Sequence, residues 1–246
     1  MRSLFCLFSV LFAVSANAQL PQNPIAQPAE HVPLAQECSV RIYGWQEQGR
    51  IVVITRSASG FRYSLPDGRT GGVAATGMGD ETVSCGPDDA VTFGGGQWPR
   101  IPLSITDTRF DSGTASLAGQ LIEPVGADTE NPLVVYAHGS EELGWIESFR
   151  DPFRMAVCGV SVFVYDKGGT GQSGGVYSQN FPRLADDLVA ASNEARRLAA
   201  GRFGRFGLIG LSQGGWIAPL AADRARADFI GIGYGLVVDI LEEDAS

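Results

Sequence analysis

Four short runs of apolar residues most constrain how this chain can fold. They cover residues 132–137, 160–165, 206–211 and 229–234. Runs of this length without polar alternation are typical of strands that are buried on both faces. Segments with helical spacing lie between them. The order strand, helix, strand, helix predicts an α/β fold, with a mainly parallel sheet covered by helices on both faces.

The segments around these runs carry further signals. Residues 105–110 and 115–122 predict a hairpin that turns at 111–113. Asp151 and Pro152 suit the N-cap and first position of a short helix that ends at Gly159. In a longer helix, apolar residues recur at intervals of three and four, at Leu184, Leu188, Ala191, Ala195 and Leu198. We expect Asp186 and Asp187 in its first turn and Arg196 and Arg197 in its last turn, where their charges interact favourably with the helix dipole.

The amino-terminal part predicts three further regions. Met1-Arg2, an apolar run over 4–14 and the small residues of 16–18 form a secretory signal peptide over 1–18, so we expect a secreted or periplasmic protein. Residues 19–37 form a proline-rich linker, in which His31 is a solvated residue. Residues 38–100 predict a small antiparallel β-rich module, with strands over 40–43, 50–55 and 61–65. The glycines of 94–96 are interpreted as a hinge before a domain over 101–246.

Composition narrows the classes of function. The formal net charge is −9, and Lys and Arg are not clustered, which argues against nucleic acid as a partner. No segment after the signal peptide is predicted to span a membrane, and the oligomeric state is open. Cys38 and Cys85 could form a disulfide in an oxidising compartment, whereas Cys158 is expected to be a small core residue. The cysteines have no nearby histidines, so no metal site is expected.

Ser212 is the strongest candidate for a catalytic residue. It lies between Gly210 and Gly214, after an apolar run and before a helical pattern. A serine at such a turn projects its hydroxyl above the end of a sheet, which is the geometry of an acyl-transfer nucleophile. Ser173 lies in a second G-x-S-x-G sequence, but no helical pattern begins there. Only Ser212 therefore meets the structural condition.

Two other motifs follow predicted strands. His138-Gly139-Ser140 follows the run 132–137, and in a serine hydrolase the N–H of Ser140 would join that of Gln213 to bind the tetrahedral oxyanion. The His138 imidazole is interpreted as a loop-shaping group. Residues 169–174 match the dinucleotide pattern G-x-G-x-x-G, but a helix would have to begin at those glycines and an acidic residue would have to end the next strand.

Together, the motifs at 138–140, 165–174 and 210–219 resemble those of the α/β-hydrolase superfamily. The resemblance covers about 105–238 and is strongest to exported bacterial serine hydrolases and aminopeptidase-like enzymes, whose hydrolase domain follows a small β-rich part. It implies hydrolysis of ester, thioester or peptide bonds in a small molecule or peptide, without a cofactor, through an acyl-enzyme at Ser212. Three residues depart from the family pattern: Glu141 where Gly is usual, Gly168 where Arg is common and Leu211 where His is frequent.

The larger departure is the missing base. In this family the acid and then the histidine follow the nucleophile. Ser212 is followed by Asp223, Asp228, Asp239 and Asp244 but by no histidine. The resemblance also implies two more strands and a helix beyond Ser246, so we expect the amino-terminal part of an enzyme, weakly active or inactive by itself. The alternatives are a non-catalytic binding module with the same fold and a nucleotide-binding oxidoreductase.

Overall fold

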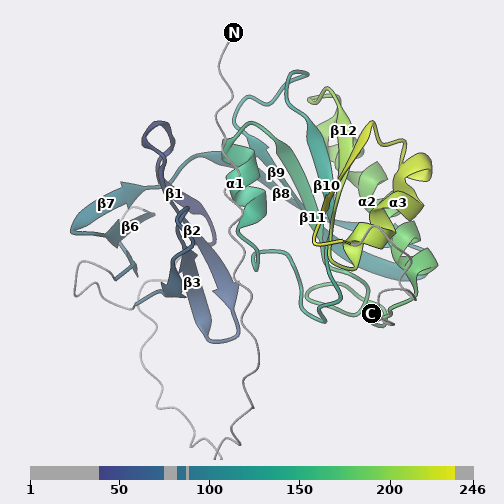
Figure 1. The fold of residues 1–246 in the computed structure, drawn as a ribbon, viewed down its shortest axis with the longest axis horizontal. Helices are drawn as coiled ribbons and strands as arrows, with labels where there is room; N and C mark the ends of the chain where they lie inside the picture. The colour runs from purple at the N-terminus through teal and green to yellow at the C-terminus, as the bar shows by residue number, and fades with distance from the viewer. Residues whose placement is uncertain (1–38, 75–81, 87–88, 236–246) are drawn as a thin grey trace, which may run out of the picture. The chain divides into compact units, whose positions relative to one another are not determined.

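The computed structural model describes residues 39–74, 82–86 and 89–235 (Figure 1). The predicted signal peptide and the whole of the predicted linker lie outside this part of the chain. His31, Cys38, Asp239 and Asp244 also lie outside it.

A six-stranded mixed sheet forms the centre of the described structure. Its strands are β8 (Leu103–Ser112), β9 (Ala115–Pro124), β10 (Leu133–Ala137), β11 (Ser161–Tyr165), β12 (Phe206–Leu211) and β13 (Phe229–Gly233). Their order is β13-β12-β10-β11-β9-β8, in which β13, β12, β10 and β11 run parallel. The predicted hairpin is β8 and β9, which pair antiparallel, and β9 also pairs antiparallel with β11. The predicted α/β class with a mainly parallel sheet is confirmed.

Helices cover both faces of the sheet because successive strand residues point to opposite sides. Val135 and Leu208 pack with α2 (Phe181–Ala199) and α3 (Gly214–Ala225). Val134 and Tyr136 face the other way, toward Trp145 and a side chain of α1 (Asp151–Val157). Figure 1 shows α2 and α3 on one side of the sheet and α1 on the other. The carboxyl ends of the parallel strands therefore remain open for loops.

The helix starts differ from the predicted ones by a few residues. Arg150, not Asp151, is the N-cap of α1. The long helix α2 begins at Phe181, after Asn180, whose side chain accepts a hydrogen bond from the Arg183 N–H. Asp186 and Asp187 consequently lie in the second turn rather than the first. Arg196 and Arg197 do lie in the last turn, as predicted.

Asp187 is buried, although an aspartate there was expected to complement the helix dipole. Its carboxylate accepts a hydrogen bond of 2.5 Å from the Ser112 hydroxyl. Burial raises the pKa of Asp187. This side chain thus joins α2 to the end of β8.

The strand β13 is less buried than its apolar sequence predicts. Ile230 is 39% exposed and Ile232 is 51% exposed. The strand lies at the edge of the described sheet, where it pairs with β12 alone. The prediction of burial on both faces is therefore wrong for this strand, whereas it is confirmed for β10 and β11.

Two small antiparallel sheets precede the six-stranded sheet in the chain. The first contains β1 (Ile42–Trp45), β2 (Arg50–Ser57), β3 (Gly60–Ser64) and β4 (Thr70–Gly72), with the short helix η1 (Gln46–Gln48) between β1 and β2. The second contains β5 (Ser84–Cys85), β6 (Ala90–Phe93) and β7 (Gly96–Pro99). The β-rich character predicted for this region is confirmed. Gly94 and Gly95 form the turn of the β6–β7 hairpin, with φ of 58° and 71°, so the predicted hinge is wrong.

The described cysteines differ from the prediction at one position. Cys158 is exposed and disulfide-bonded, so it is not a small core residue. Cys85 is also disulfide-bonded, and its predicted pairing with Cys38 stays a prediction because Cys38 lies outside the described residues. Within the described ranges, no helix is both long enough and apolar enough to cross a membrane.

Candidate active site

Ser212 occupies a tight turn between β12 and α3. Its φ is 51°, a left-handed conformation that costs a residue with a side chain about 1–3 kcal/mol. The Ser212 N–H donates to the Gly233 carbonyl at 3.0 Å, and the Gly215 N–H donates to the Ser212 carbonyl at 2.7 Å. Ser212 is exposed, and no hydrogen bond from its hydroxyl to another described residue is present. The turn therefore fixes the backbone while the hydroxyl stays available.

The two glycines of this motif are required by close packing. A Cβ atom at Gly210 would lie 2.2 Å from the Gly214 carbonyl oxygen. A Cβ atom at Gly214 would lie 1.9 Å from the Ala137 carbonyl oxygen. Real Cβ atoms do not approach oxygen this closely, so α3 can pack against the ends of β10 and β12 only with glycine at both positions.

The segment 138–140 follows β10 at the same edge of the sheet. Ser140 is exposed, while Gln213, after the turn serine, is buried. Among the residues that the structure describes, none accepts a hydrogen bond from the backbone N–H of either residue. Both donors are therefore available to a ligand.

The His138 side chain is buried inside this loop. Its ring stacks on Trp145, with 5.0 Å between ring centroids and 17° between ring planes. Neither ring nitrogen has a hydrogen-bond partner within the described chain, and the nearest carboxylate, that of Glu141, lies 3.7 Å from Nδ1. Burial lowers the pKa of His138, which favours the neutral imidazole. It packs in the loop and makes no hydrogen bond to Ser212.

Lys167 is a site residue that the sequence did not indicate. Its side chain is buried, and its Nζ donates to the Gly139 carbonyl at 2.5 Å and to Oε1 of Gln213 at 3.2 Å. Burial lowers the pKa of Lys167 to about 8, although the Glu141 carboxylate opposes this shift. The motif at 165–174 contains this residue but does not reveal its contacts, since both its partners lie in distant segments.

The glycine-rich loop after β11 is organised by Asp166. Its carboxylate accepts hydrogen bonds from the N–H groups of Trp145, Ile146 and Gln172. The Ser173 hydroxyl donates to the Asp166 carbonyl at 2.6 Å and accepts from the Ala118 N–H at 2.8 Å. No helix begins at Ser173, and α2 starts only at Phe181. This also removes the helix that the dinucleotide pattern over 169–174 requires.

The described aspartates after Ser212 lie away from it. Asp223 is exposed near the end of α3. Asp228 accepts a hydrogen bond from the Phe206 N–H at 2.7 Å, which places it at the amino end of β12, opposite Ser212. Across the described ranges, no three His, Cys, Asp or Glu side chains are grouped to hold a metal ion.

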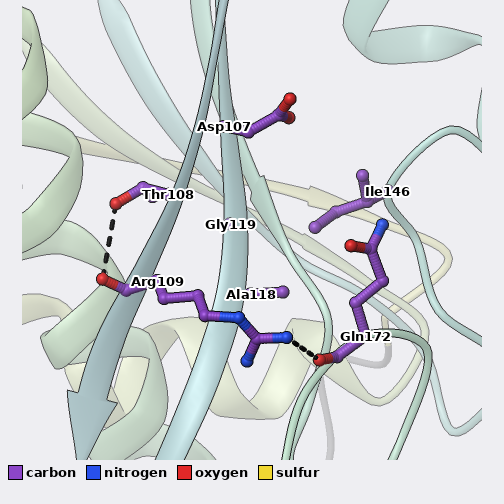
Figure 2. Close-up of a pocket in the computed structure, with 7 residues that line it drawn as sticks. All are labelled: Asp107, Thr108, Arg109, Ala118, Gly119, Ile146 and Gln172. Atoms are coloured by element: carbon purple, nitrogen blue, oxygen red, sulfur yellow. Dashed lines mark hydrogen bonds between the residues drawn. The ribbon is translucent and has the colours of Figure 1, made fainter.

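A separate pocket of about 250 Å³ lies beside β8 and β9, as Figure 2 shows. Arg109 crosses its rim, and its guanidinium donates to the Gln172 carbonyl at 2.8 Å. Asp107 and Ile146 also line the pocket. It contains none of the residues Ser140, Ser212 and Gln213, so it is distinct from the candidate site.

Comparison with known proteins adds a family and several distant structures. Residues 129–233 match the family model described as serine aminopeptidase, S33. An esterase of Pyrococcus furiosus is 26% identical over 47% of this chain and 45% of its own, with a TM-score of 0.39. An acylaminoacyl peptidase of Pyrococcus horikoshii is 18% identical over 76% of this chain and 36% of its own, with a TM-score of 0.44. A lidless α/β serine hydrolase of Xanthomonas campestris is 15% identical over 54% and 62%, with a TM-score of 0.42.

The chain therefore covers less than two thirds of each of these structures. The search of curated proteins finds no match. The family match includes β10 to β13, the segment 138–140 and the turn at Ser212. By this match, residues 129–233 are similar to the serine aminopeptidase S33 family, and the observed sheet is of the α/β-hydrolase type.

Proposed function

We propose that this chain is a serine hydrolase that cleaves ester, thioester or peptide bonds through an acyl-enzyme at Ser212. One observation carries the proposal: an exposed serine at φ 51° between β12 and α3. The strained turn leaves this hydroxyl exposed at the carboxyl end of β12, and glycine at 210 and 214 lets α3 begin beside it. The matched family description, serine aminopeptidase, adds peptides to the substrates worth testing.

In the proposed reaction, Ser212 Oγ attacks the substrate carbonyl carbon and its proton passes to a base. The carbonyl oxygen becomes an oxyanion, which accepts hydrogen bonds from the N–H groups of Ser140 and Gln213. Collapse of the tetrahedral intermediate expels the alcohol, thiol or amine and leaves the acyl group on Ser212. The start of α3 lies beside the oxyanion, where the helix dipole favours negative charge.

No base is identified among the described residues. Burial favours the neutral form of His138, but its ring nitrogens make no hydrogen bond within the described chain. A serine hydrolase without its base keeps about 10³- to 10⁴-fold catalysis over water, from the oxyanion hole and substrate binding. We therefore expect slow acylation by these 246 residues rather than full turnover.

Labelling with a fluorophosphonate tests the proposal, with Ser173 as the matched control. Wild type and Ser173→Ala should be labelled at similar rates, and Ser212→Ala should not be labelled. Equal labelling of wild type and Ser212→Ala would contradict the proposal. Rapid turnover of p-nitrophenyl butyrate that depends on Ser212 would instead show that the missing base is present after all.

A non-catalytic binding module is the second candidate, and it is favoured because no base lies near Ser212 among the residues that the structure describes. It predicts that a ligand binds with the same affinity to wild type and Ser212→Ala, and that neither protein is acylated. Loss of binding in Ser212→Ala, or acylation of wild type, would remove this candidate.

A nucleotide-binding oxidoreductase is the remaining alternative, and it predicts that NAD raises the melting temperature of the protein. We expect no such increase, because no helix begins at the glycines of 169–174.

We further propose that the protein is exported to the periplasm or secreted. The charged start and the short apolar run over 4–14 support this, as do the disulfide bonds of Cys85 and Cys158, which persist in oxidising compartments. Protein recovered from outside the cytoplasm should begin at Gln19. An intact amino terminus at Met1 in the exported protein would argue against cleavage.

A further inference from the structure

A chain of polar contacts joins the loops around Ser212, and Lys167 lies at its centre. The ammonium group donates to the Gly139 carbonyl and to the Gln213 side chain. It also lies 5.5 Å from the centre of the Tyr177 ring. Lys167 is the only lysine of the sequence, and its side chain is buried. A buried ammonium costs free energy unless its contacts compensate, so this position calls for an explanation.

A series of hydrogen bonds leads from Gln213, a partner of Lys167, back to the loop 138–140. Gln213 Nε2 donates to Oε1 of Gln179, and Gln179 Nε2 donates to the Tyr177 hydroxyl at 2.6 Å. The Tyr177 hydroxyl then donates to the Ser140 carbonyl at 2.6 Å. The carbonyls of Gly139 and Ser140 are therefore both held, one by Lys167 and the other by Tyr177.

The geometry of the peptide bond gives these contacts a consequence for the site. The Gly139 carbonyl and the Ser140 N–H belong to one planar trans peptide, so they point in opposite directions. Holding the carbonyl toward Lys167 turns the Ser140 N–H away from Lys167. Glycine at 139 restricts this peptide little, so its orientation depends on such a contact. The second contact of Lys167 holds the residue that carries the other free N–H, Gln213.

We propose that Lys167 is a positioning residue that sets the Ser140 and Gln213 N–H groups for the oxyanion, with Tyr177 as its support. The inference rests on the proposed function, because it assigns Lys167 to the same site. Lys167 does not contact the reacting atoms in this account. Its contribution is to keep two donors from separate loops pointed at one place, and a misdirected donor stabilises the transition state poorly.

A purely structural role makes a different prediction. If Lys167 only satisfied the buried Gly139 carbonyl, its loss would lower stability but leave acylation unchanged in the folded protein. The test is therefore the acylation of Ser212 by p-nitrophenyl butyrate, followed as the first release of p-nitrophenolate. This leaving group needs no proton, so slow acylation is measurable without a general acid.

The variants are Lys167→Met and Tyr177→Phe, with Gln172→Met as the control. Gln172 lies in the same loop and is exposed, and its side chain has no contact with the chain of bonds described above. We expect Lys167→Met to slow the limiting acylation rate about 100-fold, as for loss of one oxyanion donor. The half-saturating ester concentration should change by less than about threefold, since ground-state binding is not affected. Tyr177→Phe should slow acylation about tenfold, and Gln172→Met should match wild type.

Circular dichroism and thermal melting establish which variants are folded. A folded Lys167→Met protein that acylates within about threefold of wild type would overturn the inference. So would an effect on the half-saturating concentration alone. If Lys167→Met does not fold, Tyr177→Phe decides: slower acylation supports the inference and an unchanged rate overturns it. Failure of the proposed function looks different, because wild type would then release p-nitrophenolate no faster than Ser212→Ala.

Discussion

The chain contains the pattern G-x-S-x-G twice, and the two serines lie in opposite environments. The Ser173 hydroxyl makes two hydrogen bonds, to the Asp166 carbonyl and from the Ala118 N–H, and no helix follows this serine directly. Ser212 has a left-handed backbone, an exposed hydroxyl and a helix that begins two residues later. One serine joins two loops to a strand, whereas the other presents its hydroxyl to solvent.

The G-x-S-x-G sequence is the same at Ser173 and Ser212, so the different environments of the two serines result from the backbone conformation around each motif. Only the turn at Ser212 needs glycine on both sides so that a helix can approach the ends of two strands. In the other loop, glycines such as Gly171 leave room for the buried Asp166 carboxylate. The same pattern thus arises from two unrelated packing requirements.

Alanine at the last glycine of the Ser212 motif should have the largest effect. Gly214→Ala places a Cβ atom 1.9 Å from the Ala137 carbonyl, where backbone must move to accept it. We expect a loss of about 4 kcal/mol or more in the free energy of unfolding, measured with urea. The control is Gly174→Ala, whose Cβ atom would be 3.4 Å from the Ser116 carbonyl and should cost less than about 1 kcal/mol. Similar losses of unfolding free energy in Gly214→Ala and Gly174→Ala would contradict the difference in packing between the two motifs.

Removal of the carboxylate that organises the Ser173 loop should have the next largest effect. Asp166→Ala leaves the N–H groups of Trp145, Ile146 and Gln172 without their acceptor. We expect a loss of about 3 kcal/mol in unfolding free energy, because buried donors would be unsatisfied. Asp107→Asn is the control, since Asp107 is exposed and the asparagine oxygen can still accept from the buried Gln120 amide; it should cost less than about 1 kcal/mol. An Asp166→Ala protein as stable as Asp107→Asn would exclude this role.

The serine of that loop should matter for stability and not for reactivity. Ser173→Ala removes a donor to the Asp166 carbonyl and an acceptor for the Ala118 N–H. The expected loss is about 1–2 kcal/mol in unfolding free energy, with no change in the rate of fluorophosphonate labelling. Ser212→Ala should show the reverse, lost labelling with stability changed by less than about 1 kcal/mol. A Ser173→Ala protein that is stable but is not labelled would show that Ser173, and not Ser212, reacts with the fluorophosphonate.

The last effect is one of pH and concerns Lys167, which joins the loop of Ser173 to the turn of Ser212. Its pKa is about 8 in the folded protein, lower than that of an exposed lysine. Below pH 8 both states hold the proton and burial of the charge costs stability in full. As pH rises from 8 toward 10, the folded protein releases the proton first, so stability should rise with pH. The charged or titratable groups that face Lys167 are Glu141, His138 and Tyr177.

Unfolding by urea at pH 7, 8, 9 and 10 measures this effect, with Lys167→Met as the reference for all other titrations. The stability of wild type relative to Lys167→Met should increase over this range. A constant difference would show that Lys167 keeps its proton, and a decreasing one would show that its contacts hold the charged form.

Much of the fold could be predicted because the buried strands are marked by uninterrupted apolar runs. The bounds of β12 agree with the predicted run 206–211. The start of α2 was misplaced because the apolar period begins at Leu184, whereas the helix begins at Phe181 after the Asn180 cap. The exposure of β13 was missed because an apolar sequence does not show whether a strand has one neighbour or two.

The sequence motifs predicted which segments form the candidate site, but they did not predict the hydrogen bonds between those segments. The segments at 138–140, 166–174 and 210–214 end neighbouring parallel strands, so they meet at one edge of the sheet. The role proposed for Lys167 depends on a backbone carbonyl 28 residues away and an amide 46 residues away. Neither distance leaves a periodic or local signal. Buried polar contacts of this kind become visible only when the loops are placed in space.

The central claim is that Ser212, and not Ser173, is the nucleophile. Mass spectrometry of tryptic peptides from the fluorophosphonate-treated protein tests it directly, because the two serines fall in different peptides, 168–183 and 206–224. We expect the phosphonyl adduct on the peptide 206–224, at Ser212, and an unmodified peptide 168–183. An adduct at Ser173, or an adduct on 206–224 that persists in Ser212→Ala, would contradict it.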